Sequence, residues 1–276
     1  MRTAWLVLAL AVLVGGCKSV CTGQRQDKEA EPDLLASGPD LAALAVPPEP
    51  AAKAIDAAGG FTEWTRTRKL QLDCVVTVYQ PDGSFYLTEH RYEIYPWSNS
   101  IRISAQEPLS KFVWQFANGQ FSVVEGDANV DVSRMSLSYR DFAEAVLRVT
   151  TAPVGFWDKS AEFAVLPELI RVKGLWYRPT EQIRRAEQAV PADEKQKDVG
   201  LVEPYWSRVV LFQNGDSSLV DMIWFGDVRS QKFIAVRGYD YRELRKGGVL
   251  IPAKIEIFKT NPQVVLGERL VQIDLK

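Results

Sequence analysis

The sequence predicts a mainly β fold of the α+β class, with one large antiparallel sheet and a few helices. Eight Trp, nine Tyr and twelve Phe among 276 residues, together with frequent Val and Ile, favour strands over helices. Strand-like segments follow one another closely and are separated by short turn signals, which favours antiparallel pairing over helical crossovers. One amphipathic segment interrupts this series and predicts a helix that lies against the sheet.

The composition is that of a globular protein that can bury a real core. Hydrophobic residues make up 46% and charged residues 25% of the chain. Lys and Arg number 33 against 35 Asp and Glu, which gives a formal net charge of −2. A nucleic-acid-binding protein usually carries a basic excess on one face, so we expect no nucleic acid among the partners.

The first 16 residues have the character of a secretory signal peptide. Arg2 supplies one positive charge, an apolar run follows from Ala4 to Val14, and small residues precede a cysteine. The run is too short to span a bilayer core, which needs about 20 apolar residues. The stretch Leu13-Val14-Gly15-Gly16-Cys17 resembles the bacterial lipoprotein signal, which implies cleavage before Cys17 and diacylation of that cysteine. The alternative is an ordinary cleaved signal followed by an incidental cysteine.

This resemblance implies that the chain is anchored to a membrane in the bacterial cell envelope. Two acyl chains hold a protein on a bilayer stably, whereas one chain holds it only marginally. In well-studied Gram-negative bacteria, an Asp after the lipidated cysteine retains the protein in the inner membrane. Lys18 stands at that position here, so the expected location is the outer membrane, facing the periplasm.

The chain is expected to divide into three parts: a signal peptide (1–16), a lipidated cysteine with a flexible tether (17–50), and a folded domain (51–276). The tether is rich in Ala, Pro, Glu and Asp and has no aromatic residue. Such a segment cannot bury enough apolar surface to offset the entropy lost on ordering. As a flexible coil of about 30 residues, it would hold the domain on the order of 30 Å from the bilayer.

Two short helices and a long series of strands are expected in the domain. The helix-forming segment 51–58 ends at Gly59-Gly60, and a second helical turn follows at 61–64. Residues 178–197 are polar and are interpreted as a loop. The expected strands are 70–79, 85–95, 101–105, 112–116, 121–124, 169–177, 206–213, 219–225, 233–241, 249–258 and 264–275.

A further helix is expected near the middle of the domain. Ser138 and Asp141 have the S-x-x-acid spacing of a capping box, although Asp replaces the usual Glu or Gln. Phe142, Val146 and Val149 then recur at i, i+4 and i+7 and form a single apolar stripe. A helix with one apolar face, placed between strands, should pack against the sheet.

Three features of the domain together resemble a known superfamily. They are the segment Ala57–Trp64 before the first strand, the series of strands, and the segment Gly247–Ile255 near the end. With these features the chain is similar to the periplasmic lipoprotein-carrier (Lol-type) proteins and their outer-membrane relatives, over residues 51–276. The resemblance implies an incomplete antiparallel barrel, made by a large curved sheet around a few helices, with an apolar cavity for acyl chains. No binding motif of the family aligns clearly, so no binding residue is carried over.

The expected function is therefore that of a membrane-anchored envelope lipoprotein that binds a lipid or the acyl chains of a lipoprotein. The alternative is a structural or adaptor lipoprotein that presents a sheet surface to envelope proteins. Large aromatic side chains are the expected lining of an apolar cavity, although core packing is the usual role of such residues. The candidates for ligand binding are Trp114, Phe116, Trp157, Trp176 and Trp224.

No catalytic residue, metal site or cofactor is expected, because the familiar catalytic motifs are missing. Asp127-Ala128-Asn129-Val130-Asp131 opens like a calcium loop, but the required Gly and Glu do not follow, and a solvated loop is favoured. Cys74 is interpreted as an inert core thiol. His90, the sole histidine, is interpreted as an exposed strand residue. In an oxidising compartment Cys21 and Cys74 could also form a disulfide.

Overall fold

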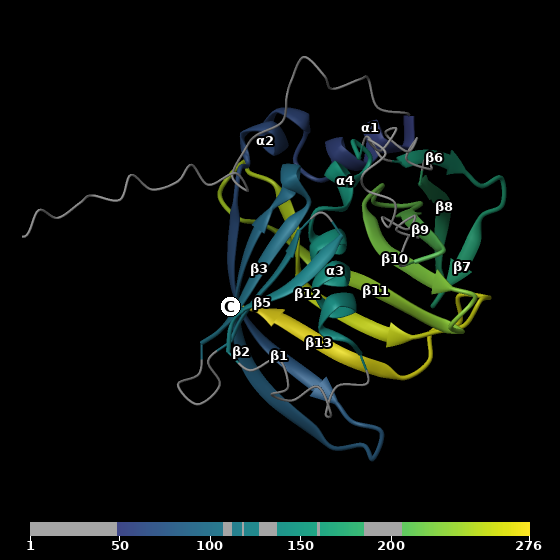
Figure 1. Cartoon of the computed structure of the whole chain (residues 1–276). Coiled ribbons are helices and arrows are strands. Elements are labelled where there is room, and N and C mark those ends of the chain that lie inside the picture. The colour runs from purple at the N-terminus through teal and green to yellow at the C-terminus, as the bar shows by residue number, and fades with distance from the viewer. Residues whose placement is uncertain (1–48, 107–111, 118, 127–136, 159–160, 185–205) are drawn as a thin grey trace, which may run out of the picture. The chain divides into compact units, whose positions relative to one another are not determined.

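In a computed structural model, a single curved antiparallel sheet surrounds helix α3 (Figure 1). The structure describes residues 49–106, 112–117, 119–126, 137–158, 161–184 and 206–276, all within one compact unit. The predictions for Cys17, Lys18, Cys21 and the loop 127–131 lie outside these residues.

The order of elements follows the expected series of strands with a central helix. The bounds of the described elements are α1 (Glu49–Ala57), α2 (Phe61–Arg66), β1 (Leu70–Tyr79), β2 (Phe85–Tyr95), the short 3₁₀ helix η3 (Pro96–Ser98), β3 (Ser100–Ala105), β4 (Val113–Ala117), β5 (Gln120–Glu125), α3 (Tyr139–Thr150), α4 (Ala152–Gly155), β6 (Ala161–Val165), β7 (Ile170–Val172), β8 (Leu175–Arg184), β9 (Arg208–Asn214), β10 (Val220–Asp227), β11 (Lys232–Glu243), β12 (Leu250–Lys259) and β13 (Arg269–Leu275).

The sheet is large but does not close. Within the described residues its strand order is β5-β4-β3-β2-β1-β13-β12-β11-β10-β9-β8-β6, with β7 attached to β8, and every pairing is antiparallel. The first and last strands pair with each other, so β1 and β13 lie in the middle of the sheet. In the described residues the two edge strands, β5 and β6, do not pair with each other. The expected incomplete barrel is thus confirmed.

The concave face of the sheet holds the main core. On β1 the side chains of Leu70, Leu72, Cys74, Val76 and Val78 all point to this face, as the period-2 alternation of a strand requires. They pack with helices α1, α3 and α4 in one continuous apolar cluster. The core therefore lies between the curved sheet and the helices that it encloses.

Part of the sheet is buried on its convex face as well. Strand β10 is buried without interruption from Val220 to Gly226, and β9 is buried from Val209 to Asn214. A second apolar cluster covers this region, and Val264 and Leu266 from the β12–β13 connection pack against it. Burial on both faces explains the continuous apolar runs at 209–212 and 222–225, which do not alternate with polar residues.

The segment 169–184 differs from the prediction. A turn at Lys173 and Gly174, both with positive φ, divides the expected strand into the hairpin β7–β8. The prediction of a loop from 178 was wrong as far as residue 184, because β8 continues to Arg184. Thr180 and Gln182 are polar yet buried, so the polar composition concealed a strand.

A helical corner closes one end of the half barrel. Helix α1 ends at Gly59 and Gly60, whose φ values of 106° and 88° reverse the chain into α2. A Cβ atom on Gly59 would lie 2.7 Å from the Gly248 carbonyl oxygen, so this close approach to the β11–β12 connection requires glycine. The Trp64 indole N–H donates to the Ala58 carbonyl at 3.0 Å and fixes the corner.

Candidate functional site: helix α3 across the open side of the barrel

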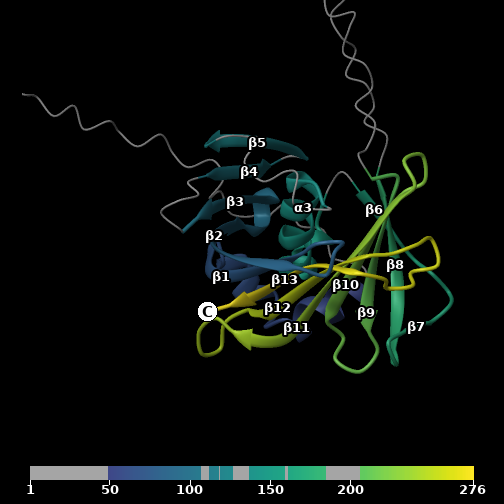
Figure 2. The same ribbon diagram turned by 90° about the horizontal axis from the view of Figure 1, so that it is seen from below.

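Helix α3 begins and packs as the sequence predicts. The Ser138 hydroxyl accepts a hydrogen bond from the Asp141 backbone N–H at 3.2 Å, which confirms the N-cap. The apolar stripe formed by Phe142, Val146 and Val149 is buried against the concave face. Figure 2 shows the helix between the β3–β5 arm and the β6–β10 side of the sheet.

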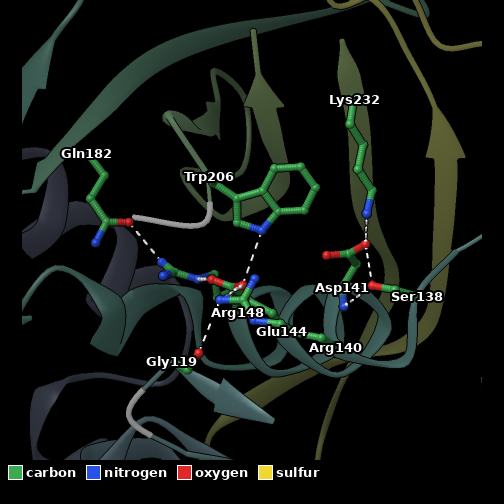
Figure 3. Close-up of polar contacts among 9 residues, drawn as sticks. All are labelled: Gly119, Ser138, Arg140, Asp141, Glu144, Arg148, Gln182, Trp206 and Lys232. Atoms are coloured by element: carbon green, nitrogen blue, oxygen red, sulfur yellow. Dashed lines mark hydrogen bonds and ion pairs between the residues drawn. The ribbon is translucent and has the colours of Figure 1, made fainter. Parts of the chain in front are cut away.

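The other face of α3 carries a line of charges. Arg140, Glu144 and Arg148 recur every four residues and therefore lie on one side of the helix. The Arg140 Nη2 atom donates to the Gly119 carbonyl in the β4–β5 turn at 3.1 Å. The Arg148 Nη1 atom donates to Gln182 Oε1 on β8 at 2.8 Å (Figure 3). One helix is thus hydrogen-bonded to both ends of the open sheet.

Glu144 is the centre of this arrangement. Its side chain is 1% exposed. One carboxylate oxygen accepts from Arg148 Nε at 2.9 Å and the other from the Trp206 indole N–H at 3.1 Å. The Arg140 guanidinium lies 3.7 Å from the same carboxylate. A carboxylate so deeply buried is tolerated because it is both paired and hydrogen-bonded.

A second buried carboxylate ties the start of α3 to the sheet. Asp141 is fully buried and accepts a hydrogen bond from the Ser138 hydroxyl at 2.5 Å. The same oxygen contacts the ammonium group of Lys232 at the start of β11 (Figure 3). The helix is therefore held at its N-terminal turn, at Glu144 and at Arg148, in each case through a polar contact to a distant segment.

Cys74 and His90 are neighbours on the concave side of the sheet, an arrangement that the sequence did not suggest. They are partners in the β1–β2 register, and both are buried. The prediction of an exposed His90 was wrong: its ring is surrounded by Phe112, Trp114 and Phe142, with centroids 5.3 to 6.3 Å away. The reason is that the inward positions of β2 end under α3 rather than in solvent.

The pKa values of this pair oppose nucleophilic chemistry. Burial, with a smaller contribution from Asp73, raises the pKa of the Cys74 thiol to about 12. Burial alone lowers the pKa of His90 to about 3. A reactive thiolate–imidazolium pair needs the opposite order, with the thiol more acidic than the imidazolium. Cys74 is a free, buried thiol.

The five predicted lining residues do not form one site. Trp114 and Phe116 lie on the concave face, and the Trp114 ring is stacked between Phe112 at 3.9 Å and Tyr139 at 4.0 Å. Trp157 packs at the rim of the same core.

The remaining two lie elsewhere. Trp224 is on the convex face, stacked on Phe233 with centroids 5.8 Å apart, and its indole N–H donates to the Asn261 carbonyl. Trp176 on β8 is 53% exposed. Only the first three can therefore face a common interior.

The charged line on α3 was missed at the level of sequence. Its spacing of four residues was a readable signal of one helix face. Its partners were not readable, because Gln182, Trp206 and Lys232 come from segments far along the chain. In the part of the chain that the structure describes, no three His, Cys, Asp or Glu side chains gather as metal ligands. None of the described helices has the length and apolar character needed to cross a membrane.

The solved structures that are similar to this chain include the following three. A LolA superfamily protein from Nitrosomonas europaea has 15% identity and a TM-score of 0.49, over 84% of this chain and 92% of its own. A DUF1329 family protein from Desulfovibrio piger has 11% identity and a TM-score of 0.39, over 75% and 82%. A domain described as an outer membrane lipoprotein-sorting protein, from Vibrio parahaemolyticus, has 10% identity and a TM-score of 0.39, over 75% and 82%.

No family model matches the sequence, and no curated protein matches it either. The chain's own open antiparallel sheet, and the helix that the sheet encloses, define an incomplete β barrel.

Proposed function

We propose that this chain is a membrane-anchored envelope lipoprotein that binds a lipid, or an acylated protein, on the concave face of its half barrel. The observation that carries the proposal is the position of α3. An apolar helix face covers the concave wall of an unclosed sheet, while its opposite face is held to both ends of that sheet by polar contacts.

Binding would require an acyl chain to take the place of the apolar face of α3. Four large buried side chains of the helix, at about 1.5–3 kcal/mol each, contribute roughly 6–12 kcal/mol. About ten buried acyl methylenes, at about 0.8 kcal/mol each, would contribute roughly 8 kcal/mol. Because these magnitudes are similar, the exchange is feasible if Arg140 and Arg148 find new partners in water.

The test is lipid binding by the gently purified protein, measured by native mass spectrometry and by uptake of a fluorescent phospholipid. Arg148→Ala frees one end of α3 and should speed uptake of the probe. Arg208→Ala is the matched control, because Arg208 forms an exposed ion pair with Glu181 away from α3. Failure of both the wild type and Arg148→Ala to bind lipid would refute the proposal.

The anchor is tested separately. Cys17→Ser should abolish lipid labelling and membrane association, because no other site for diacylation is expected. A variant that still partitions into the membrane to the same extent would remove the anchor from the proposal and leave the lipid-binding role to be judged on its own.

We also propose that the role is binding rather than catalysis. The pair most similar to a catalytic dyad, Cys74 and His90, has pKa values shifted away from reactivity. Alkylation by iodoacetamide should therefore be slow at Cys74 in the folded protein. Rapid modification there under native conditions would argue for a reactive thiol instead.

A second candidate function is favoured by the β1–β2 hairpin. The end of this hairpin extends beyond the part of β2 that pairs with β3. Phe85 and Leu87, in this end, are 60% and 57% exposed. Figure 1 shows this hairpin projecting from the sheet. An adaptor that presents this surface to an envelope protein should yield a defined protein crosslink through the hairpin in cells, and recovery of lipid alone would count against it.

A further inference from the structure

One end of the domain carries exposed apolar side chains among clustered cations. Phe61, the first residue of α2, is 37% exposed, and Leu244 in the β11–β12 connection is 40% exposed. Next to Phe61 lie the half-buried rings of Trp157, at 5.5 Å, and of Trp97, which is 6.3 Å from Trp157. We call this set, with residues 61–69 and 242–248, the α2-end surface.

The two segments of the α2-end surface are held together. The Arg245 guanidinium lies 3.3 Å from the Glu63 carboxylate, which joins the β11–β12 connection to α2. The Leu250 backbone N–H donates to the Ala58 carbonyl at 2.9 Å, and Gly59 sits against Gly248. The apolar and basic side chains of these two segments therefore belong to one corner of the domain, held together by these contacts.

The charge of this surface differs from that of the chain as a whole. Residues 61–69 and 242–248 contain six Lys or Arg against two Glu, whereas the whole chain has 33 basic and 35 acidic residues. Arg66, Arg68, Arg245 and Lys246 are exposed. Basic side chains around exposed apolar and aromatic residues fit an anionic bilayer, where cations meet the headgroups and apolar side chains enter the headgroup–acyl boundary.

We infer that the α2-end surface docks on an anionic lipid bilayer. The point at which the described chain begins supports a bilayer rather than a protein as the partner. Helix α1 begins at Glu49 and packs against α2 and α4, so the segment expected to tether the domain enters at this same end. Figure 1 shows α1, α2 and α4 gathered there.

This inference goes beyond the proposed lipid-binding role, because it needs no ligand inside the barrel. A flexible tether of about 30 residues restricts distance but not orientation. It also keeps the bilayer at a high effective concentration, so a weak surface can set the orientation. Docking would turn the α2 end toward the headgroups and the projecting β1–β2 hairpin away from them.

The test is hydrogen–deuterium exchange of the full chain on vesicles of phosphatidylglycerol and phosphatidylethanolamine, compared with phosphatidylcholine alone. Peptides covering 61–68 and 242–249 should exchange several-fold more slowly on the anionic vesicles, and high salt should remove most of this protection. Leu244→Ser combined with Lys246→Glu should also remove it. Leu169→Ser, at another exposed leucine, is the matched control and should keep it.

Equal protection on both kinds of vesicle, no protection on either, or protection that requires an added protein fraction would each overturn the inference. Failure of the proposed anchor would look different. It would lower the amount of protein bound to the vesicles. The bound molecules would still be protected in the same peptides. Loss of lipid binding in the barrel would leave protection at the α2-end surface unchanged.

Discussion

Two buried polar clusters lie on opposite faces of the same sheet, and they are built differently. On the concave side, the Glu144 carboxylate directly binds Arg148 and the Trp206 indole. On the convex side, the guanidinium binds a tyrosine hydroxyl instead of a carboxylate: Arg237 Nη2 donates to the Tyr177 hydroxyl at 3.1 Å.

The convex cluster also contains a carboxylate that binds no cation directly within hydrogen-bonding distance. Asp221 accepts from the Asn214 amide at 2.9 Å, and the Arg237 guanidinium stacks over the Tyr239 ring at 4.6 Å. Burial raises the pKa of Tyr177 to about 12, and burial also raises the pKa of Asp221. This cluster joins strands whose backbones are already held together by the hydrogen bonds of the sheet.

The difference shows what each cluster can do. The concave contacts join a helix to the sheet, and the same groups can be solvated if the helix moves. The convex contacts join β8, β9, β10 and β11, which cannot separate without breaking backbone hydrogen bonds. We therefore expect substitutions on the concave side to affect both stability and ligand exchange, and substitutions on the convex side to affect stability alone.

The largest effect is expected from Glu144→Ala. It leaves Arg148 and Arg140 near the core without their carboxylate, and breaking a buried pair by removing one partner costs about 3–5 kcal/mol. Urea unfolding should show this loss. Glu181→Ala, which removes an exposed ion pair with Arg208, should cost less than about 1 kcal/mol. Equal losses in the two variants would mean that Glu144 does not hold α3.

The next effect is a pH dependence caused by His90. Its folded pKa of about 3 lies below the unfolded value of 6.5, so the unfolded chain takes up the proton first. Stability should therefore be full above pH 6.5 and fall as the pH decreases toward 3. At about pH 4.5 the loss should be roughly 2–3 kcal/mol, from about 1.4 kcal/mol per pH unit.

The control for this prediction is His90→Phe, which places an apolar ring among the same aromatic neighbours. Because His90 is the sole histidine, the difference between wild type and variant isolates its titration from that of the carboxylates. Parallel stability curves between about pH 7 and about pH 4.5 would show that the ring is more accessible to solvent than its surroundings indicate.

Some of these positions could be predicted from the sequence, and others could not. The strands β1 and β2 were predicted with their observed bounds, because Pro81-Asp82-Gly83-Ser84 marks the turn and the flanking residues alternate. The start of α3 was predicted because its cap and its apolar stripe are local. The open barrel was predicted from the family resemblance and not from any local sequence pattern.

What could not be predicted depended on distant segments. Nothing near His90 in sequence shows that α3 covers it. Strand β8 was concealed by the buried polar residues Thr180 and Gln182, and the partner of Gln182, Arg148, lies far away on α3. The five aromatic candidates were chosen by residue type alone, and residue type does not specify a face of the sheet. Trp224, one of these candidates, lies in the second apolar cluster on the convex face.

A smaller effect is expected from Tyr177→Phe on the convex face. The variant keeps the ring but leaves Arg237 without its hydroxyl acceptor, and a lost buried hydrogen bond to a charged group costs about 1.5–3 kcal/mol. Tyr79→Phe, whose hydroxyl lies 3.4 Å from Gln272 at a half-buried site, should cost clearly less. Uptake of the fluorescent phospholipid should not change in Tyr177→Phe, and a faster uptake would mean that the two faces are coupled.

The smallest effect, and one of opposite sign, is expected from Asp221→Asn. Because the folded pKa of Asp221 is raised by burial, its contribution to stability falls as the pH rises from the unfolded value through the folded one. An amide at this position can still accept from Asn214 and carries no charge. The variant should therefore match the wild type in stability below the unfolded pKa of Asp221, and it should be slightly more stable than the wild type above the folded pKa.

Asp73→Asn is the contrasting control for Asp221→Asn. The hydrogen bonds from Arg91 lower the pKa of Asp73, so its contribution is present at neutral pH and is lost as the pH falls through the folded pKa. Asparagine at position 73 should thus weaken the protein near neutrality, where asparagine at position 221 strengthens it. If both variants lose stability at neutral pH, Arg237 stabilises the Asp221 carboxylate more than burial disfavours it, and the convex cluster is an ion pair after all.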